Sequence, residues 1–480
     1  MGDRSDIAFG TSGLRGPASG FDAALVDAHV AAFARVCLEP HHNRLLIGRD
    51  LRASSPEIAA LVAASAVRLG LAPIDCCAVP TPALALAAAR AGMPAIMVTG
   101  SHIPADRNGL KFYRPEGELR KADEGPIARI AADLLAADGL PDRLPDPMLP
   151  SPAGEDAAER YCRRFTDWFA PDALAGLTIG VFEHSSVGRD LLVAIIEALG
   201  ATCHRFGKSE SFIAVDTEAV DAEHLAQISA EIARHGLDCV VSTDGDADRP
   251  LLVDGAGRQI AGDVLGALTA RALGIEAIVT PITSTTALEA SGWFARVVRT
   301  RIGSPYVVEA MEALGDRPVL GFEANGGVLT LGTVHSGERE LGPLVTRDAV
   351  LPLVAVLAAS VAASRTLTEM AADLPARIMA ADRVRDVDPE SGTRFLDRIQ
   401  KDRAARSKLH AELAGVAAID LTDGVRLTLQ DGRIVHFRQS GNAPEMRCYV
   451  ETGSAGETAE LLGALIARMK DSLGEEIESR

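Results

Sequence analysis

The sequence predicts an α/β protein in which three consecutive α/β segments precede a smaller α+β segment. With 480 residues, the chain is too long for a single hydrophobic core, so we expect several domains. Short apolar runs alternate with Ala-rich helical runs through most of the chain, which is typical of α/β domains. From about Arg377 the order changes to several short strands followed by one long terminal helix, which is typical of an α+β domain.

The first segment predicts strands at Leu45–Arg49, Ile74–Val79 and Ala95–Val98, with a helix over Pro56–Leu69. A Pro-rich stretch, Leu140–Pro152, then has the composition of a linker. We therefore expect a first domain over residues 1–145.

The alternation restarts twice after that linker, which indicates a weak internal repeat. We expect a second domain over 153–255, a third over 256–370 and a fourth over 371–480. Their predicted elements are strands at Leu177–Phe182, Leu237–Ser242, Ala277–Thr283, Arg296–Thr300, Val319–Phe322, Val425–Leu429, Ile434–Phe437 and Arg447–Val450, and helices over Asp190–Leu199, over Ala349–Ala363 and from Glu457.

Charge and cysteine content exclude several classes of protein. The net charge of −18 argues against non-specific binding to nucleic acid, which needs a basic surface. The seven cysteines are scattered without a Cys-x-x-Cys pair, so we expect neither a disulfide framework nor a zinc site, and a reducing cytoplasm fits best. The N-terminus is polar, and the apolar run Ala349–Ala363 contains Pro352 and is too short to cross a bilayer, so we expect no membrane association.

Serine 101 is the strongest candidate for catalysis. It lies in Thr99–Pro104, directly after an apolar strand, and ligands of α/β sheets bind at the carboxyl ends of such strands. His102 is adjacent and Lys111 follows shortly. A hydroxyl with a base and a cation nearby suits covalent transfer of a group such as phosphoryl. The alternative is a turn whose serine only caps the next segment.

The loop Thr243–Arg249 predicts a metal site. It places Asp244, Asp246 and Asp248 at alternate positions after an apolar strand, so the three carboxylates can point to one place. A calcium loop would need Gly at its sixth and Glu at its twelfth position, where Arg249 and Gly255 stand. A short acidic loop that leaves room for phosphate and water suits Mg²⁺. The alternative is a solvated acidic turn.

The segment Arg438–Pro444, with Arg447 just after it, predicts an anion site between two strands. Arginine supplies a bidentate fork, while Ser, Gly and Asn supply hydroxyl and backbone N–H donors in a tight turn. The alternative is an ordinary Gly-Asn hairpin turn.

Three further loops follow predicted strands or lie near the N-terminus. In Gly321–Gly327, Glu323 and Asn325 suit binding of vicinal sugar hydroxyls, although glycine-rich turns after strands are common. Arg15 lies in a glycine-flanked loop, and Gly48–Arg52 adds basic groups. Surface loops are the alternative for both.

Taken together, these motifs resemble those of the α-D-phosphohexomutase superfamily, which contains phosphomannomutases and phosphoglucomutases. Gly-Thr-Ser-Gly-Leu-Arg-Gly, Thr-Gly-Ser-His-Ile-Pro, Asp-Gly-Asp-Ala-Asp-Arg, Gly-Phe-Glu-Ala-Asn-Gly-Gly and Arg-Gln-Ser-Gly-Asn-Ala-Pro occur in the family's order along nearly the whole chain. The resemblance implies three related α/β domains and a fourth, smaller domain around a central cleft.

The resemblance also implies roles for individual residues. Ser101 would be the phosphoserine and, with the three aspartates, a ligand of Mg²⁺. Arg15 and Lys111 would be acid–base candidates, assisted by His102. The residues expected to bind the substrate are Arg249, Gly303, Ser304, Glu323, Asn325, Arg438, Ser440, Gly441, Asn442 and Arg447, of which Arg438, Ser440, Asn442 and Arg447 would hold the phosphate that is not reacting.

The implied reaction interconverts mannose 6-phosphate and mannose 1-phosphate through a hexose 1,6-bisphosphate, which also serves as activator, and supplies GDP-mannose and surface-polysaccharide synthesis. Many family members have Asn at Ile103, Ser-Gly-His at Asn325–Gly327 and Thr-Glu at Asn442–Ala443, so this chain departs from the family's pattern at these positions while it keeps Glu323. The version found here looks most like bacterial phosphomannomutases. Phosphoglucomutase and phosphoglucosamine mutase activities are alternatives, as are a phosphohydrolase and a silent sugar-phosphate sensor. We expect a monomer or homodimer.

Overall fold

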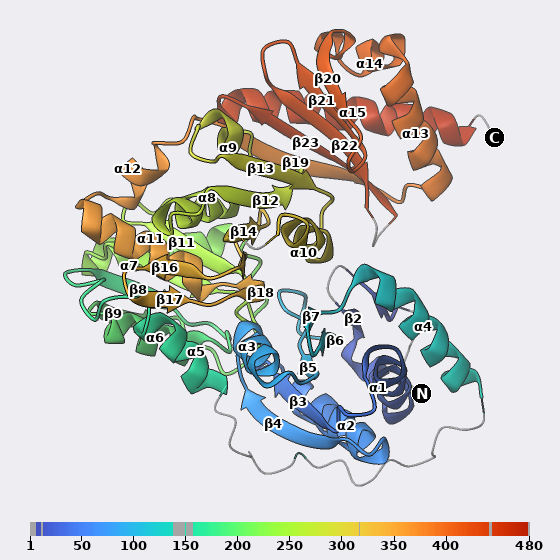
Figure 1. The fold of residues 1–480 in the computed structure, drawn as a ribbon. Coiled ribbons are helices and arrows are strands. Elements are labelled where there is room, and N and C mark those ends of the chain that lie inside the picture. Colours follow the sequence, from blue (N-terminus) through green and yellow to red (C-terminus); the bar gives the residue numbers. More distant parts are fainter. Residues whose placement is uncertain are drawn as a thin grey trace. The chain divides into compact units, whose positions relative to one another are not determined.

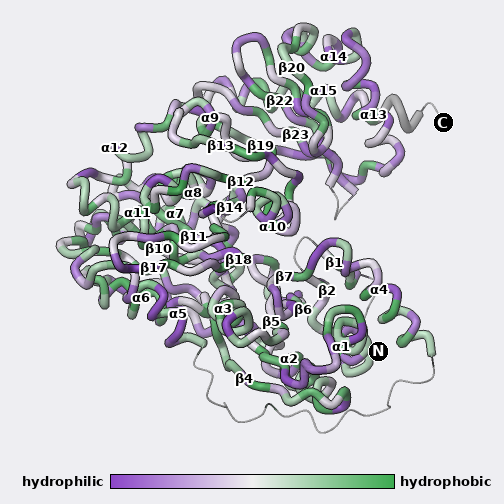
Figure 2. The backbone as a smooth tube through the Cα atoms, viewed as in Figure 1, coloured by the Kyte–Doolittle hydropathy of each residue, from purple (hydrophilic) through white to green (hydrophobic). Residues whose placement is uncertain are grey.

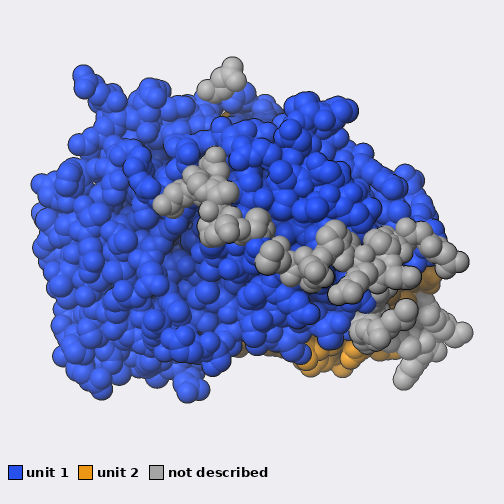
Figure 3. Space-filling model, turned by 90° about the horizontal axis from the view of Figure 1, so that it is seen from below, with its two compact units in different colours: residues 1–278, 303–371 blue, residues 279–302, 372–480 orange. Residues whose placement is uncertain are grey.

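The computed structural model describes residues 6–10, 13–137, 149, 157–315, 317–440 and 444–478. The chain divides into two compact units (Figure 3): residues 1–278 with 303–371, and residues 279–302 with 372–480. We call them unit 1 and unit 2. The expected linker Leu140–Pro152 lies outside the described residues, apart from Leu149.

Unit 1 begins with a seven-stranded sheet in the order β1-β2-β6-β5-β3-β4, in which β7 pairs with β6 (Figure 1). Helices α1, α2 and α4 share one hydrophobic core with this sheet, and hydrophobic residues run along much of α1 (Figure 2). The elements are β1 (Ala8–Phe9), β2 (Leu14–Pro17), η1 (Ala18–Gly20), α1 (Ala23–Cys37), β3 (Arg44–Arg49), α2 (Ser55–Arg68), β4 (Ala72–Ala78), α3 (Thr81–Ala91), β5 (Ala95–Val98), β6 (Arg107–Arg114), β7 (Gly117–Glu118) and α4 (Lys121–Ala136).

The next sheet has the order β11-β10-β8-β9, with β8 parallel to both neighbours and β11 antiparallel to β10. The strand expected at Leu237–Ser242 begins only at Cys239, because α7 ends at Gly236 in the left-handed conformation and the chain needs Leu237 and Asp238 to reach the sheet. The elements are α5 (Ala157–Thr166), β8 (Thr178–Phe182), α6 (Arg189–Ala198), β9 (Thr202–Phe206), α7 (Ala222–His235), β10 (Cys239–Thr243) and β11 (Pro250–Asp254).

The remainder of unit 1 contains the antiparallel strands β14, β15 and β18 and a small β16–β17 hairpin. The apolar run near residue 350 forms α11, which is buried along most of its length. Among the described residues, no helix is long and apolar enough to cross a membrane. The elements are α8 (Gly262–Ala272), α10 (Ser304–Glu312), β14 (Val319–Phe322), β15 (Val328–Leu331), β16 (Val334–Ser336), β17 (Arg339–Leu341), β18 (Leu344–Asp348), α11 (Val350–Ala363) and α12 (Leu367–Ala371).

Unit 2 is built on an antiparallel sheet in the order β19-β23-β22-β21-β20. Helices α13, α14 and α15 pack on this sheet around one core, and the carboxylate of Glu451 accepts hydrogen bonds from Thr285 and Thr286. The elements are β12 (Ala277–Pro281, which crosses the boundary between the units), α9 (Ala287–Ala290), β13 (Arg296–Thr300), β19 (Ile378–Arg385), α13 (Pro389–Lys401), α14 (Arg403–Leu409), η2 (Ala411–Ala414), β20 (Val416–Asp420), β21 (Val425–Leu429), β22 (Ile434–Gln439), β23 (Glu445–Thr452) and α15 (Ala455–Glu478).

Candidate active site

Ser101 lies in a tight loop between β5 and β6. Its side chain is buried and its backbone has a φ of +54°, a left-handed conformation that is uncommon for a residue other than glycine. Its Oγ donates a hydrogen bond to Asp244 Oδ2 at 2.6 Å and lies 3.3 Å from His102 Nδ1. The loop therefore presents the serine hydroxyl directly to the acidic loop.

The buried side chain of Arg52 holds the serine loop in place. Its guanidinium donates to four carbonyl oxygens, those of Ser101 (2.8 Å), Ile103 (2.6 Å), Pro104 (2.6 Å) and Arg107 (2.9 Å).

Gly100 and Asp50 complete this arrangement. A Cβ at Gly100 would lie 2.6 Å from Arg52 Cζ, so only glycine fits beside the guanidinium. Asp50 pairs with Arg52 Nε at 3.1 Å and neutralises its charge. The arginine therefore fixes the backbone of the candidate nucleophile and of the residues that follow it.

The acidic loop follows β10, and all three of its aspartates are buried. Each offers one carboxylate oxygen, and these oxygens lie within 4.8 Å of one another. The loop closes on itself because Asp244 Oδ1 accepts the backbone N–H groups of Asp248 and Arg249, both at 3.1 Å. The alternating carboxylates therefore converge, as their spacing predicts.

Cations from two other parts of unit 1 neutralise this loop. Lys111 Nζ donates to Asp246 Oδ2 at 2.5 Å and to Asp248 Oδ2 at 2.7 Å. Arg347 Nη2 donates to the same oxygen of Asp248 at 2.7 Å. Burial acts to raise the pKa of Asp248, but Arg347 and Lys111 hold that pKa well below its usual range. Burial and the neighbouring aspartates raise the pKa of Asp244.

The acidic loop has the donors that a hard divalent cation requires. Asp246 Oδ1 and Asp248 Oδ1 are buried and, within the described part of the chain, have no hydrogen-bond partner, although buried carboxylate oxygens are normally paired. The convergent ligands are all oxygens, which Mg²⁺ prefers over nitrogen or sulfur. The three aspartates, with Ser101 Oγ beside Asp244, therefore fit such an ion.

The glycine-rich loop after β14 packs against the acidic loop. Glu323 and Asn325 are both buried, and Arg347 Nη1 donates to Glu323 Oε2 at 3.0 Å. A Cβ at Gly327 would lie 2.5 Å from the carbonyl oxygen of Asp248, so the two loops approach as closely as glycine permits. Arg347 thus binds one carboxylate in each loop.

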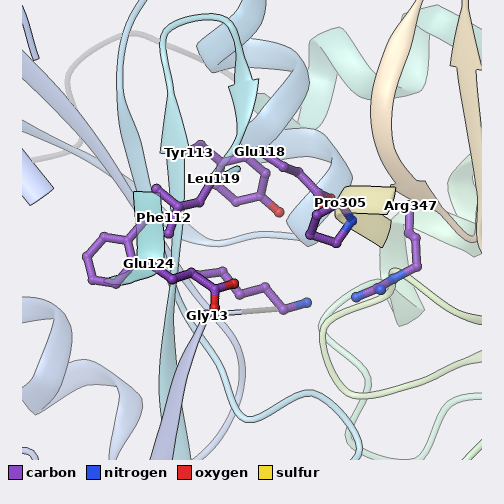
Figure 4. Close-up of a pocket in the computed structure, with 9 residues that line it drawn as sticks. Gly13, Phe112, Tyr113, Glu118, Leu119, Glu124, Pro305 and Arg347 are labelled. Carbon is purple, nitrogen blue, oxygen red and sulfur yellow. The ribbon is translucent and has the colours of Figure 1, made fainter. Parts of the chain in front are cut away.

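A pocket opens beside these groups in unit 1. Arg347 and Pro305 lie on one side of it, and Phe112 and Glu124 lie on the other (Figure 4). Lys111 and Glu118 also line it.

Glu118 joins the wall of this pocket to β18 and α10. It accepts hydrogen bonds from Ser304 Oγ at 2.9 Å and from Thr346 Oγ1 at 2.5 Å. Ser304 follows Gly303, whose φ of +128° sets the turn into α10.

Two basic groups near the serine are electrostatically perturbed. Burial, reinforced by Arg249 and Arg347, lowers the pKa of Arg15 to about 10. Burial, reinforced by the positive charges of Arg249 and Arg15, lowers the pKa of His102 to about 2. His102 is therefore neutral at physiological pH, and Arg15 remains a cation whose buried Nε has no hydrogen-bond partner among the residues that the structure describes.

The predicted anion site lies in unit 2. Arg438 and Arg447 are directly opposite each other on β22 and β23. Arg438 Nε donates to Asp423 Oδ2 at 2.9 Å, and Arg447 pairs with Glu445. Ser440 N donates to the carbonyl of Glu445. Gly441 and Asn442 lie outside the described residues.

Comparison with known proteins identifies the family. Models of the phosphoglucomutase/phosphomannomutase α/β/α domains I, II and III match residues 6–152, 159–257 and 261–378. A phosphomannomutase of Sinorhizobium fredii is 42% identical over 97% of this chain and 99% of its own length. The chain belongs to the phosphoglucomutase/phosphomannomutase family. A phosphomannomutase of Salmonella muenchen is 35% identical over 98% of this chain and 97% of its own length.

A solved structure shows the same fold. The phosphoglucomutase/phosphomannomutase family protein of Burkholderia thailandensis aligns with a TM-score of 0.76 over 98% of both chains, at 20% identity. The predicted fold class, three α/β domains followed by an α+β region, is confirmed by these matches.

Unit 1 brings together most of the residues that the family motifs indicate. Ser101, Lys111 and the three aspartates are in direct contact. Sequence reasoning did not single out Arg347 or Glu118, and it weighed Arg52 only as part of a basic loop. No motif marks Arg347. The need for glycine at position 100 becomes visible only in the structure, where the Arg52 guanidinium lies beside it.

Proposed function

We propose that this protein is a phosphomannomutase that interconverts mannose 6-phosphate and mannose 1-phosphate through a phosphorylated Ser101. The observation that supports this most is the 2.6 Å contact between Ser101 Oγ and the buried aspartate cluster. A nucleophilic hydroxyl beside a cation site is the arrangement that phosphoryl transfer requires. The two near full-length phosphomannomutase relatives support the choice of mannose.

In the proposed cycle, the free hydroxyl of the hexose phosphate attacks the phosphorus of phosphoserine 101. The new O–P bond forms as the bond to Ser101 Oγ breaks, and the hydroxyl proton passes to a base of the site. The resulting hexose 1,6-bisphosphate turns end for end, and Ser101 Oγ takes back the other phosphoryl group. Added hexose 1,6-bisphosphate would activate the enzyme by phosphorylating Ser101.

The residues around Ser101 have distinct proposed roles in this cycle. Lys111 and Arg15 supply positive charge near the transferred group and are the acid–base candidates, assisted by neutral His102. Asp244, Asp246 and Asp248 would hold Mg²⁺ together with Ser101. The ion would neutralise charge that develops on the phosphoryl oxygens.

Further residues are proposed to bind the substrate. Glu323 and Asn325 would bind sugar hydroxyls, and Arg249, Gly303 and Ser304 would bind the substrate nearby. We propose that Arg438, Ser440, Gly441, Asn442 and Arg447 bind the phosphate that is not reacting.

We propose domain boundaries at 1–145, 153–255, 256–370 and 371–480, the last carrying the distal phosphate loop.

The cysteines of the described structure are free, which supports a reducing cytoplasm as the place of action.

Turnover of three sugars tests the proposal directly. Mannose, glucose and glucosamine 1-phosphates are supplied separately with Mg²⁺ and a trace of the matching 1,6-bisphosphate. We expect mannose 6-phosphate to form fastest. Preference for another hexose would overturn the choice of sugar, and release of free phosphate without isomerised product would indicate a phosphohydrolase.

Replacing the proposed nucleophile tests the mechanism. Ser101→Ala should abolish turnover and leave the temperature of thermal unfolding unchanged, because only one hydroxyl is lost. Ser65→Ala is the matched control, since Ser65 is also buried and its Oγ has no hydrogen-bond partner. Equal turnover in Ser101→Ala and the unsubstituted protein would exclude the phosphoserine mechanism.

A further inference from the structure

A second group of metal-ligand side chains lies in unit 1, on elements that carry none of the proposed active-site residues. His204 is on β9, the edge strand of its sheet, while Glu231 and His235 are on α7 (Figure 1). Each offers one ligand atom, and the three atoms lie within 4.8 Å of one another.

The geometry of this cluster matches a three-ligand metal site. His204 Nε2 lies 2.9 Å and His235 Nε2 lies 3.4 Å from the same oxygen, Glu231 Oε2. Ligands bound at about 2.0–2.1 Å in tetrahedral geometry are separated by about 3.3–3.4 Å. The two nitrogen–oxygen distances are therefore close to the separation of two ligands on one ion.

The surroundings of Glu231 orient its carboxylate towards the two histidines. Arg234 Nη1 donates to Glu231 Oε1 at 2.8 Å, which leaves Oε2 directed at the two histidines. Glu231 and His235 are four residues apart on one helix, so they lie on the same face. The two imidazole rings lie with centroids 4.0 Å apart and planes inclined by 30°, so a side-chain rotation is needed for both nitrogens to point at one ion.

We propose that His204, Glu231 and His235 form a binding site for a divalent transition metal, with Zn²⁺ as the preferred ion. Two imidazole nitrogens and one carboxylate oxygen suit Zn²⁺, whereas Mg²⁺ prefers an all-oxygen set such as the aspartate loop. The side chain of His235 is 39% exposed, so water can fill the fourth position. The bound ion would cross-link the edge strand β9 to α7.

Calorimetric titration of the full-length protein with Zn²⁺ tests this site. The protein is first stripped with a chelator and then saturated with Mg²⁺, which occupies the aspartate loop. We expect one Zn²⁺ to bind per chain, with affinity at least tenfold weaker in His204→Gln and in His235→Gln. His224→Gln is the matched control, because this α7 histidine pairs with Asp221 instead, and its zinc affinity should not change.

A spectroscopic measurement separates this site from the aspartate loop. Co²⁺ bound by two histidines and a carboxylate should give visible absorption bands that are more intense than those of an octahedral all-oxygen site. These bands should disappear in His235→Gln, while turnover with Mg²⁺ stays unchanged. Absence of zinc binding in the Mg²⁺-saturated protein would overturn the proposal, as would equal zinc affinity in the His204 and His235 variants and the unsubstituted chain.

Discussion

The role of Arg52 in holding the serine loop Thr99–Pro104 can be tested by replacing it with methionine. The substitution keeps much of the side-chain volume and removes the guanidinium. Four carbonyl oxygens, including that of Ser101, lose their donor. The carboxylate of Asp50 is left buried without its ion-pair partner.

The size of the effect follows from these contacts. Removing one partner of a buried ion pair costs roughly 3–5 kcal/mol, and each buried carbonyl left without a donor costs about 1–3 kcal/mol unless water reaches it. The loop will relax to reduce this cost, and that relaxation displaces Ser101 from Asp244. A misplacement of about 1 Å can lower a rate by roughly 10²-fold. We therefore expect kcat of Arg52→Met to fall about 100-fold or more.

The assay separates positioning from substrate binding. Arg52 has its donors engaged by the loop and by Asp50, so KM for the hexose phosphate should change little while kcat falls. Arg49→Met is the matched control. It removes an arginine at the end of β3 that pairs with Asp75 at 3.0 Å, and its kcat should stay close to the unsubstituted value because the hydrogen bonds from Arg52 to the serine loop remain. A kcat for Arg52→Met as high as that of Arg49→Met would refute the reasoning.

Three further predictions concern other parts of the molecule. Lys111→Met should lower turnover by about 10²–10⁴-fold, the range for losing an acid–base group, and steady-state kinetics showing normal kcat would contradict that role. Gly327→Ala should raise KM for the sugar phosphate, because its Cβ would meet the carbonyl of Asp248 at 2.5 Å. An unchanged KM would mean that the glycine-rich loop after β14 can shift without affecting substrate binding. Burial lowers the pKa of His436 from 6.5 to about 4. Acidification from pH 6.5 towards 4 therefore protonates this histidine in the unfolded chain before it does so in the folded protein. The free energy of unfolding then falls by at most about 1.4 kcal/mol per pH unit. Thermal unfolding of His436→Asn should be less sensitive to pH over that range, and equal sensitivity would rule out this contribution.

Local sequence patterns were sufficient to predict much of the site in unit 1. The alternating aspartates after an apolar strand converge as expected, because a tight loop after a buried strand leaves their side chains few other directions. The same is true of Ser101, which emerges at the end of β5. The predicted strands at Ala95–Val98, Arg296–Thr300 and Val319–Phe322 match the structure residue for residue, since short apolar runs between turn residues leave little freedom in register.

Other features depend on contacts between segments that are far apart in the sequence. Arg52 was weighed as a surface-loop cation, yet it is buried against carbonyls about 50 residues away. Arg347 binds Asp248 and Glu323 from a strand with no recognisable motif. The charge of an arginine in a sequence does not reveal which acceptors will surround it.

The sequence by itself determined the family, the order of its loops and the chemical identity of the candidate nucleophile and of the clustered carboxylates, because these depend on residue type and short-range spacing. The tertiary structure decided which cations neutralise those carboxylates and how Ser101 is held in a left-handed backbone conformation. It also brought His204 of β9 to Glu231 and His235 of α7. These outcomes depend on long-range packing, which brings together groups whose separation along the chain carries no periodic or compositional signal.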